Sequence, residues 1–514
     1  MSRGDWAVVV LVLVAATVSA VGFEFAPADG GMVARFQAVP LDDSWIHYVY
    51  AKSLGTTLRL DYNPGHSEAG FTSLLWVVLL APPLALGIDP PLASKLLGLA
   101  SHVAVALLLY AWLKRVAPRA LAIGAALLLA AEPIFAYAAM SGMEVMLYTA
   151  LMLGSALLFL QERYRVCAVA LGLCVLARPD GMVLVCFTWA AAGLQMGLAR
   201  FRDPALGWRQ LAWLMGLPLA VGAAWCLYCL VATGLIFPTS YYVRAGGVGF
   251  LSNLRYIGRI LHEISYSLFP LSHWPKALLL LPGAAFAIRR YRARALVPVL
   301  FPAAFALSMG GEVIGVIGGS FLGNRYLVPV FPFLLALQGM GIVLLADGVR
   351  WLTPGRAVAR WATPLAAVLL LLLLELPYGQ WVGRLRDQQA TYAQSCANIQ
   401  QMQVAIGHWV ARSTPADAVI AVHDAGALRY LGGRETIDFL GLNTTDLPAK
   451  DLATIEQVAD YLITFPSWTP HLAEPFADRE VLRVVLDRNV VCAADTMVVY
   501  AVKPGAAPLR SDRR

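Results

Sequence analysis

Two adjacent carboxylates, Asp42 and Asp43, open the stretch "LDDSWIHYVYAKSL" (41–54), which follows the first long apolar run of the chain. Charged side chains beside a membrane are costly unless they take part in function or are neutralised. The apolar residues behind the pair recur at helical spacing, and an aspartate at a helix start is an ordinary cap. Because one aspartate satisfies the cap, the pair predicts a general base for a hydroxyl or a ligand of a divalent cation.

Other charged side chains stand where apolar runs begin or end, and each also has a structural explanation. Glu144 precedes an apolar run, where the helix dipole favours an acid in any case. Arg178 and Asp180 flank Pro179 in a turn, "ARPDG", and can simply form a salt bridge. Arg325 begins a later apolar run and can be a membrane-edge anchor.

Histidines and one intramembrane acid complete the set of candidates that the residue types alone suggest. His47 lies four residues after Asp43 and therefore shares a helix face with it. His423 precedes Asp424 in a polar region, where the aspartate can instead stabilise a turn. Glu132 precedes Pro133 inside an apolar run and is either a functional acid or part of a kink.

The composition predicts a polytopic membrane protein. Of the 514 residues, 59% are hydrophobic and only 14% are charged, whereas soluble domains carry roughly 25% charged residues. The net charge of +7 does not indicate nucleic-acid binding, because the arginines lie between apolar runs, where orientation signals occur. The sequence contains no Walker loop, dinucleotide fingerprint or zinc motif of the HExxH kind.

Apolar runs and basic loops together predict about eleven membrane spans with the N-terminus inside and the C-terminus outside. The strongest inside marker is "RRYRAR" (289–294). The first run is interpreted as a retained helix, with a cleaved signal peptide as the alternative. The predicted spans are 6–23, 92–113, 120–138, 145–160, 166–177, 181–198, 211–232, 276–288, 295–311, 326–346 and 361–378.

One further apolar run, residues 70–88, is predicted not to cross the membrane. If it did, every later basic loop would face the wrong side. Pro82 and Pro83 break it, so it is interpreted as a re-entrant or interfacial element, with a twelfth crossing as the alternative. The long polar stretches then all face outward, which places the chemistry, and the first outer loop 24–91, on that side.

The polar C-terminal region predicts a second domain, so that the chain divides into 1–379 and 380–514. Short buried strands are expected at 419–423, 461–464 and 496–502, and helices at 392–412 and 450–460, which gives a small α/β domain. Cys396 and Cys492 lie in this domain, and a disulfide between them is possible if it is outside the cytoplasm.

Eight segments in order resemble the GT-C glycosyltransferases of bacteria, and in particular the terminal arabinofuranosyltransferases of the mycobacterial cell wall. The resemblance covers most of the chain, and it rests on the order of the segments rather than on any one of them. The segments are "DDSWIHYVYAKSL", "YNPGHSEAGFTSLLW" (62–76), "SGMEVMLY" (141–148), "LARPDG" (176–181), "PTSYYVR" (238–244), "GGE" (310–312), "NRYLVPVFP" (324–332) and "VHDAGALRYLGGRETIDFLGL" (422–442).

The resemblance implies a polyprenyl-phosphate sugar as donor and the acidic pair as the catalytic signature, with Asp42 the likelier base and Asp43 its partner. Arg244 stands where the family often has lysine, and Arg325 is a second phosphate-binding candidate. Glu312 replaces the aspartate of the family's "GGD", and Val145 replaces the threonine after Glu144. The full set of substrate-binding candidates is His47, Glu68, Glu144, Arg178, Asp180, Tyr241, Arg244, Glu312, Arg325 and His423.

The expected function is therefore an inverting glycosyltransferase of the bacterial inner membrane that moves one sugar, arabinofuranose by resemblance, to a cell-envelope glycan, lipid or glycoprotein on the periplasmic side. A divalent cation (Mg, Mn or Ca) is the one cofactor considered, with Asp43 and Glu144 as its ligands. Two alternatives stay open. A lipid-linked sugar flippase would need polar groups through both halves of the bilayer, and an assembly protein would bind envelope polymer without catalysis.

Overall fold

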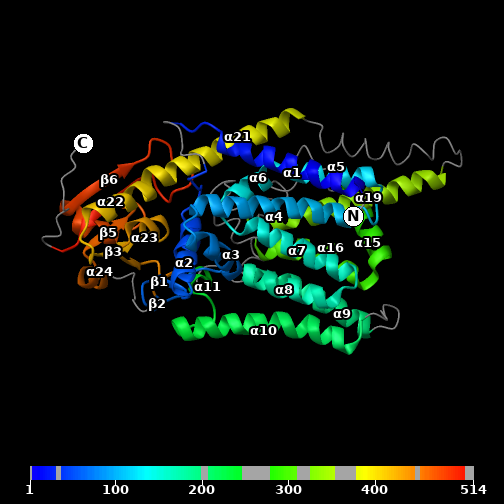
Figure 1. Cartoon of the computed structure of the whole chain (residues 1–514), viewed down its shortest axis with the longest axis horizontal. Helices are drawn as coiled ribbons and strands as arrows, with labels where there is room; N and C mark the ends of the chain where they lie inside the picture. The colour runs from blue at the N-terminus through cyan, green and yellow to red at the C-terminus, as the bar shows by residue number, and fades with distance from the viewer. Residues whose placement is uncertain are drawn as a thin grey trace.

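The computed structural model describes residues 3–29, 36–197, 206–245, 278–309, 325–352, 378–445 and 452–503. Helices fill one end of the molecule and an α/β part lies at the other, with α2 and α3 between them (Figure 1). The last predicted span, 361–378, lies almost wholly outside the described residues, as does Glu312.

The helical part follows the apolar runs, because each run is long enough to bury backbone hydrogen bonds inside a helix. Every predicted span that falls on described residues overlaps a helix. The helices are α1 (Arg3–Glu24), α2 (Asp43–Thr57), α3 (Leu74–Ala85), α4 (Pro90–Leu113), α5 (Arg119–Ala131), α6 (Pro133–Met140), α7 (Val145–Leu160), α8 (Tyr164–Ala177), α9 (Met182–Gly197), α10 (Trp208–Thr233), α11 (Thr239–Ala245), α15 (Leu280–Tyr291), α16 (Leu296–Ser308) and α19 (Phe331–Leu352).

Among the described residues, four helices are long and apolar enough to cross a membrane, and a fifth span is possible if a bent pair counts as one. The protein is thus a mostly helical chain with multiple candidate spans. The number of about eleven and the inside–outside orientation stay predictions. The four helical segments are Gly4–Glu24, Pro90–Leu113, Trp208–Thr233 and Val328–Gly348.

The bent pair covers the predicted span 120–138 and breaks it into two helices. The helix stops at Ala131 and resumes at Pro133, with an angle of 53° between α5 and α6. Pro133 has no N–H to continue the ladder, and it forces the preceding Glu132 into an extended conformation with ψ 123°. The kink interpretation of Glu132 therefore describes its backbone.

The run 70–88 contains α3 (Leu74–Ala85), a helix of 12 residues with Pro82 and Pro83 near its end. Its length of ~18 Å is short of the ~30 Å hydrocarbon core. It packs closely on α2, since a Cβ on Gly55 would collide with the backbone oxygen of Ala81. Whether this segment enters the bilayer stays a prediction.

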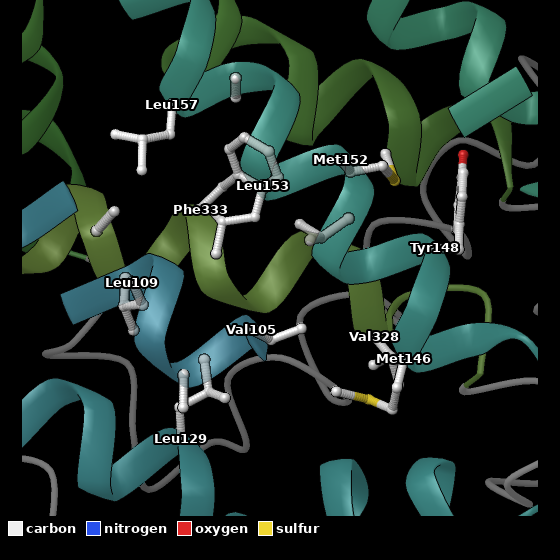
Figure 2. Close-up of a cluster of buried hydrophobic side chains, with 14 of the residues drawn as sticks. Val105, Leu109, Leu129, Met146, Tyr148, Met152, Leu153, Leu157, Val328 and Phe333 are labelled. Carbon is white, nitrogen blue, oxygen red and sulfur yellow. The ribbon is translucent and has the colours of Figure 1, made fainter. Parts of the chain in front are cut away.

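The core of the helical part lies between α4, α7 and α19, and Figure 2 shows its side chains. Val105 and Leu109 from α4, Leu153 from α7 and Phe333 from α19 are all fully buried. Tyr148 lies at one end of this cluster (Figure 2). Truncating any of these leucines to alanine costs roughly 2–5 kcal/mol, so the core fixes the helix ends that carry the polar candidates.

The C-terminal part contains a mixed five-stranded sheet with the order β4-β3-β5-β7-β6. β3 is parallel to both β4 and β5, whereas β7 is antiparallel to β5 and β6. The three predicted strands are present, and β4 and β6 were missed. The elements are β3 (Val419–Val422), α23 (Ala427–Gly432), β4 (Glu435–Asp438), α24 (Leu452–Val458), β5 (Tyr461–Thr464), α25 (Pro470–Ala473), β6 (Glu480–Val485) and β7 (Thr496–Ala501).

The predicted helix 392–412 is the outer part of a longer helical rod. α21 (Tyr378–Ile399) runs into a π-helical turn, Gln400–Val404, and then into α22 (Ala405–Ser413). A π turn inserts one extra residue, which rotates the side chains that follow it and is frequent at functional sites. The rod runs from the helical end to the α/β end of the molecule (Figure 1).

The two parts share a buried junction built by the segment between α2 and α3. The hairpin β1 (Asp61–Asn63) and β2 (His66–Ser67) follows α2. Asn63 exchanges two hydrogen bonds with the backbone of Thr436, at 2.9 and 3.0 Å, and the Tyr62 hydroxyl donates to the Ala425 carbonyl at 2.8 Å. The loop therefore aligns the C-terminal sheet with α2 and with the acidic pair.

Candidate functional site

Asp42 lies at the start of α2 and is held by the C-terminal part. Its two carboxylate oxygens accept hydrogen bonds from the backbone N–H groups of Gly426 and Ala427, each at 2.8 Å. Burial and the like charge of Asp424 raise the pKa of Asp42 to about 8, against the two N–H donors that lower it. Asp42 thus ties the two parts together and favours the protonated form near neutral pH.

Asp43, one residue on, has different surroundings. Its Oδ2 accepts a hydrogen bond from Nη2 of Arg325 at 2.8 Å, and 44% of its side chain is exposed. Arg325 itself is only 5% exposed and lies over the Tyr326 ring, 5.2 Å from its centroid. The buried arginine and the half-exposed carboxylate thus form a charge-assisted hydrogen bond, and the exposed part of the carboxylate is accessible to a ligand.

A second charged group consists of Glu144, Arg178 and Asp180. Nη1 of Arg178 donates to Glu144 at 3.0 Å, and its Nε donates to both oxygens of Asp180 at 3.0 and 3.2 Å. Burial raises the pKa of Glu144, but the Arg178 guanidinium and nearby His47 outweigh it, so the net pKa is lowered. The predicted salt bridge in "ARPDG" is present, and Glu144 extends it across two helices.

Several buried polar atoms in this region have no hydrogen-bond partner among the described residues. Leaving such an atom unpaired costs about 1–3 kcal/mol, so a group of them is typical of a site that a ligand or water completes. The charges of Glu144, Asp43 and Arg325 all act on His47, and Arg178 contacts both Glu144 and the Tyr148 ring, so the atoms belong to one region. They are Nδ1 of His47, Oε2 of Glu144, Oη of Tyr148, and Nε and Nη1 of Arg325.

The predicted metal ligands do not fit a cation site in this arrangement. Asp43 and Glu144 are each paired with an arginine. No group of three His, Cys, Asp or Glu side chains in the described ranges is placed to hold a metal ion. Transfer activity measured after chelator treatment tests the predicted requirement for a cation.

Glu68 lies at the junction of the two parts. Its carboxylate accepts hydrogen bonds from the hydroxyl of Thr445, at 3.0 and 3.2 Å, and from the backbone N–H of Thr445 at 3.2 Å. Its backbone oxygen accepts a hydrogen bond from the Tyr228 hydroxyl. These contacts describe a docking residue, and the predicted substrate-binding role stays a prediction.

Two further candidates, Tyr241 and Arg244, lie on the short helix α11 (Thr239–Ala245). Tyr241 lies on α11 with 54% of its surface exposed and packs against Phe237 and Tyr242. Arg244 lies on the same short helix, but its side chain is outside the description. The substrate-binding roles of Tyr241, Arg244 and Glu312 therefore stay predictions from the sequence.

His423 lies at the end of β3, where its Nδ1 and Oδ1 of Asp424 are 2.9 Å apart. The other oxygen of Asp424 accepts a hydrogen bond from Nε2 of Gln403 at 2.7 Å, and Gln403 comes from the π turn. Three aromatic rings meet the imidazole edge-on, from Phe439, Phe465 and Trp468. This arrangement belongs to the C-terminal part and is separate from the Asp43 group.

The sequence reading missed several of these partners. Tyr148 and Tyr326 flank the Arg178 guanidinium at 5.4 and 5.0 Å, and both occur in the segments "SGMEVMLY" and "NRYLVPVFP", next to predicted site residues. Nothing in the sequence signals the π turn that presents Gln403. Cys396 and Cys492 are both free thiols, so the possible disulfide is not formed in this structure.

The fold can be compared with known proteins. A family model described as "Domain of unknown function (DUF8728)" matches residues 395–504, which corresponds to the C-terminal part. No curated protein matches the chain.

Solved membrane enzymes share the architecture over nearly the whole chain. The archaeal oligosaccharyltransferase AglB from Archaeoglobus fulgidus, in complex with an inhibitory peptide and a dolichol-phosphate, is 12% identical with a TM-score of 0.56, covering 99% of this chain and 76% of that one. ArnT from Cupriavidus metallidurans, bound to undecaprenyl phosphate, is 17% identical with a TM-score of 0.55, covering 98% and 99%. The apo form of ArnT matches equally well. The chain thus has the fold of AglB and ArnT.

Proposed function

We propose that this chain transfers a single sugar from a polyprenyl-phosphate donor to a hydroxyl of a cell-envelope acceptor, at the periplasmic face of the bacterial inner membrane. The observation that carries the proposal is the group of unpartnered buried polar atoms beside the Asp43–Arg325 pair. AglB and ArnT were solved with dolichol-phosphate and undecaprenyl phosphate, which supports a lipid phosphate as the ligand here.

Arg325 is the proposed phosphate-binding residue. One of its nitrogens is committed to Asp43, and Nε and Nη1 remain as two donors with no partner among the described residues. A guanidinium with two adjacent donors suits the bidentate binding of a phosphate group. The lipid tail then stays in the bilayer, while the phosphosugar lies at the membrane edge beside Asp43.

Asp43 is the proposed base. Its ionised carboxylate takes the proton of the acceptor hydroxyl as that oxygen forms a bond to the anomeric carbon. The bond from the anomeric carbon to the phosphate oxygen breaks, its electron pair leaves with the polyprenyl phosphate, and one displacement inverts the configuration. Positive charge develops on the sugar ring, and the carboxylates of Asp43 and Glu144 stabilise it electrostatically.

The geometry favours Asp43 over Asp42 for this role, which reverses the order that the resemblance implied. Both oxygens of Asp42 are occupied by backbone N–H groups, and its raised pKa disfavours the ionised form that a base requires. Asp42 is therefore proposed as the positioning residue that holds the C-terminal part against the site. Arabinofuranose remains the sugar that the resemblance names.

The test is transfer by the full-length protein in detergent from a panel of synthetic polyprenyl-phosphate sugars, each offered with envelope glycans and lipids as acceptors. We expect one donor to be used by wild type, with an inverted product, and not by Asp43→Asn. Silence of the folded wild-type protein across the panel would contradict the proposal and favour the flippase or the assembly protein.

A further inference from the structure

The C-terminal sheet contains a position at which open α/β sheets bind ligands. From β3 the chain passes through α23 to β4 on one side of β3, and then through α24 to β5 on its other side. Ala427 and Leu428 of α23 pack with Ile420 and Val422 on one face of the sheet, and Ile455 of α24 packs on the other face with Ala421. The carboxyl ends of β3 and β5 therefore form a topological switch point, where ligands bind in such sheets.

The residues that follow these two strands meet at this edge. His423 and Asp424 follow β3, and the backbone N–H of His423 donates to the Ile463 carbonyl at 3.1 Å. Phe465 and Trp468 follow β5 and contact the imidazole edge-on, with ring centroids 5.2 and 5.7 Å away. We call His423, Asp424, Phe465 and Trp468 the sheet-edge group.

Two members of the group have the chemistry of ligand-binding side chains. Trp468 exposes 57% of its surface although its neighbour His423 is 93% buried, at 7% exposure. A lone exposed tryptophan needs no explanation, but this one is oriented by a buried ring and offers a fixed aromatic face. Nδ1 of His423 lies 2.9 Å from Oδ1 of Asp424. In the tautomer with the proton on Nδ1, this nitrogen donates to the carboxylate, and Nε2 is the acceptor that a ligand hydroxyl can use.

Hydrogen bonds hold two side chains of the sheet-edge group, His423 and Asp424, in place. Gln403 is fully buried, and the π turn brings its amide to Asp424 at 2.7 Å. Its oxygen and nitrogen also lie 3.7 and 3.5 Å from the Cys492 thiol. The imidazole, the carboxylate and the amide are thereby fixed in one chain of contacts, so the group is organised before any ligand arrives.

The charges of the side chains at this edge of the sheet favour a neutral ligand over an anion. Switch points of this kind often take phosphates, which need N–H donors and cations. The described acids at this edge, Asp424 and Asp438, disfavour an anion, and Arg429 is turned to the Tyr62 carbonyl at 2.8 Å. A neutral, polyhydroxylated ligand that stacks on an aromatic ring and donates to an imidazole fits the group.

The location connects this ligand to the proposed reaction. The N–H groups that hold Asp42 belong to Gly426 and Ala427, on the loop that begins with His423. Four residues of chain separate His423 from Ala427, so their Cα atoms are at most ~14 Å apart. An extended oligosaccharide on the sheet-edge group can therefore reach the acidic pair with its end.

We infer that the sheet-edge group, His423, Asp424, Phe465 and Trp468, is the acceptor subsite of this protein and binds a neutral oligosaccharide. Trp468 stacks on a sugar ring, and His423, positioned by Asp424, accepts a hydrogen bond from a sugar hydroxyl. The inference rests on the proposed function for the identity of the ligand as the acceptor, and on the sheet edge alone for the binding of carbohydrate.

Binding of carbohydrate is tested without turnover, by saturation-transfer NMR on the full-length protein in detergent. The probes are tri- and tetrasaccharides of arabinose, galactose, mannose and glucose, with uridine monophosphate as the anionic alternative. We expect a neutral oligosaccharide to bind wild type and Asp43→Asn alike. Trp468→Ala should weaken binding roughly tenfold or more, as truncation of an aromatic anchor does, and Trp468→Phe should retain most of it.

The matched control is Val485→Ala. Val485 is 59% exposed on β6, at the far edge of the same sheet, and its truncation should leave binding unchanged. Equal binding by Trp468→Ala and Val485→Ala, binding of uridine monophosphate alone, or no binding by any probe would overturn the inference.

The two proposals fail separately. Trp468-dependent binding without transfer by any donor would leave the subsite standing and remove the transferase. Transfer by wild type with the same acceptor KM in Trp468→Ala would keep the transferase and remove the subsite. With both proposals correct, Trp468→Ala raises the acceptor KM and leaves the donor KM unchanged.

Discussion

Asp42 and Asp43 are neighbours in sequence, yet they belong to two regions that satisfy their polar groups differently. Around Asp42, the carboxylate oxygens of the acids accept hydrogen bonds. Asp42 accepts from two backbone N–H groups, and Glu68 accepts from Thr445. Asp438 accepts from the backbone N–H groups of Leu440 and Asn443. Around Asp43, the charges are paired but incompletely: Arg325 and Glu144 each retain buried atoms with no partner among the described residues.

This difference in hydrogen bonding indicates which region has a structural role and which has a functional one. A buried polar group with all its hydrogen bonds made holds a fold together, whereas one left unpaired costs about 1–3 kcal/mol and is kept only where something repays it. The Asp42 region thus docks the C-terminal part, and the Asp43 region is the one that we propose to bind the substrate. The following variants test that division.

Asp43→Asn should have the largest effect. Removal of the base should lower kcat by ~10²–10⁴-fold with little change in folding, because the amide occupies the same volume. Transfer kinetics with the donor identified in the panel measure it. Asp29→Asn is the control, since Asp29 lies between α1 and α2 and 68% of its side chain is exposed. A variant that keeps more than a tenth of wild-type kcat would contradict the role of Asp43.

Arg325→Ala should come next and act on the donor. Loss of hydrogen bonds to a charged phosphate costs roughly 1.5–3 kcal/mol each, so the donor KM should rise more than tenfold, with a smaller effect for Arg325→Lys. Steady-state kinetics with varied donor measure it. Arg488→Ala is the control, because the Arg488–Asp29 pair is exposed at 62% and 68%. An unchanged donor KM in Arg325→Ala would place the phosphate elsewhere.

Gly426→Ala should weaken the contact between Asp42 and the loop that follows β3, and it should leave the Arg325–Asp43 pair unchanged. A Cβ at Gly426 would lie 2.7 Å from Oδ2 of Asp42, too close for any real contact, and such overpacking costs ~1–3 kcal/mol. Hydrogen exchange of residues 422–432 should become faster. Gly124→Ala is the matched control, since a Cβ there meets nothing within 4 Å. Equal protection in the two variants would mean that Asp42 does not hold the loop.

Part of the fold and of the candidate site could be predicted from the sequence alone. The long apolar helices were predictable, because each apolar run is long enough to form a helix. The strands β3, β5 and β7 were predictable, because their residues are apolar and mostly buried on both faces of the sheet. β4 and β6 carry Glu435, Asp438, Glu480 and Arg483, which hide their strand pattern. The acidic pair was visible as two charges beside a membrane. The division of labour within it was not, because it depends on contacts 282 and 384 residues away along the chain.

The smallest expected effect is a pH dependence of stability. The folded pKa of Asp42, about 8, lies above the ~3.9 of an unfolded aspartate, so the folded state binds the proton more tightly between these values. Its contribution to stability is full below about pH 4 and is lost as pH rises to about 8. The Tm of wild type should therefore fall more steeply from pH 5 to 8 than that of Asp42→Asn. An equal or steeper slope in the variant would contradict the raised pKa.

The central claim is that the incompletely satisfied region around Asp43 is the donor site. The most direct measurement is a cryo-electron microscopy structure of the full-length protein in lipid nanodiscs with undecaprenyl phosphate. The account predicts the phosphate within hydrogen-bonding distance of Nε and Nη1 of Arg325, with Asp42 still bound to Gly426 and Ala427. A phosphate held elsewhere, with those two nitrogens still unpartnered, would contradict it.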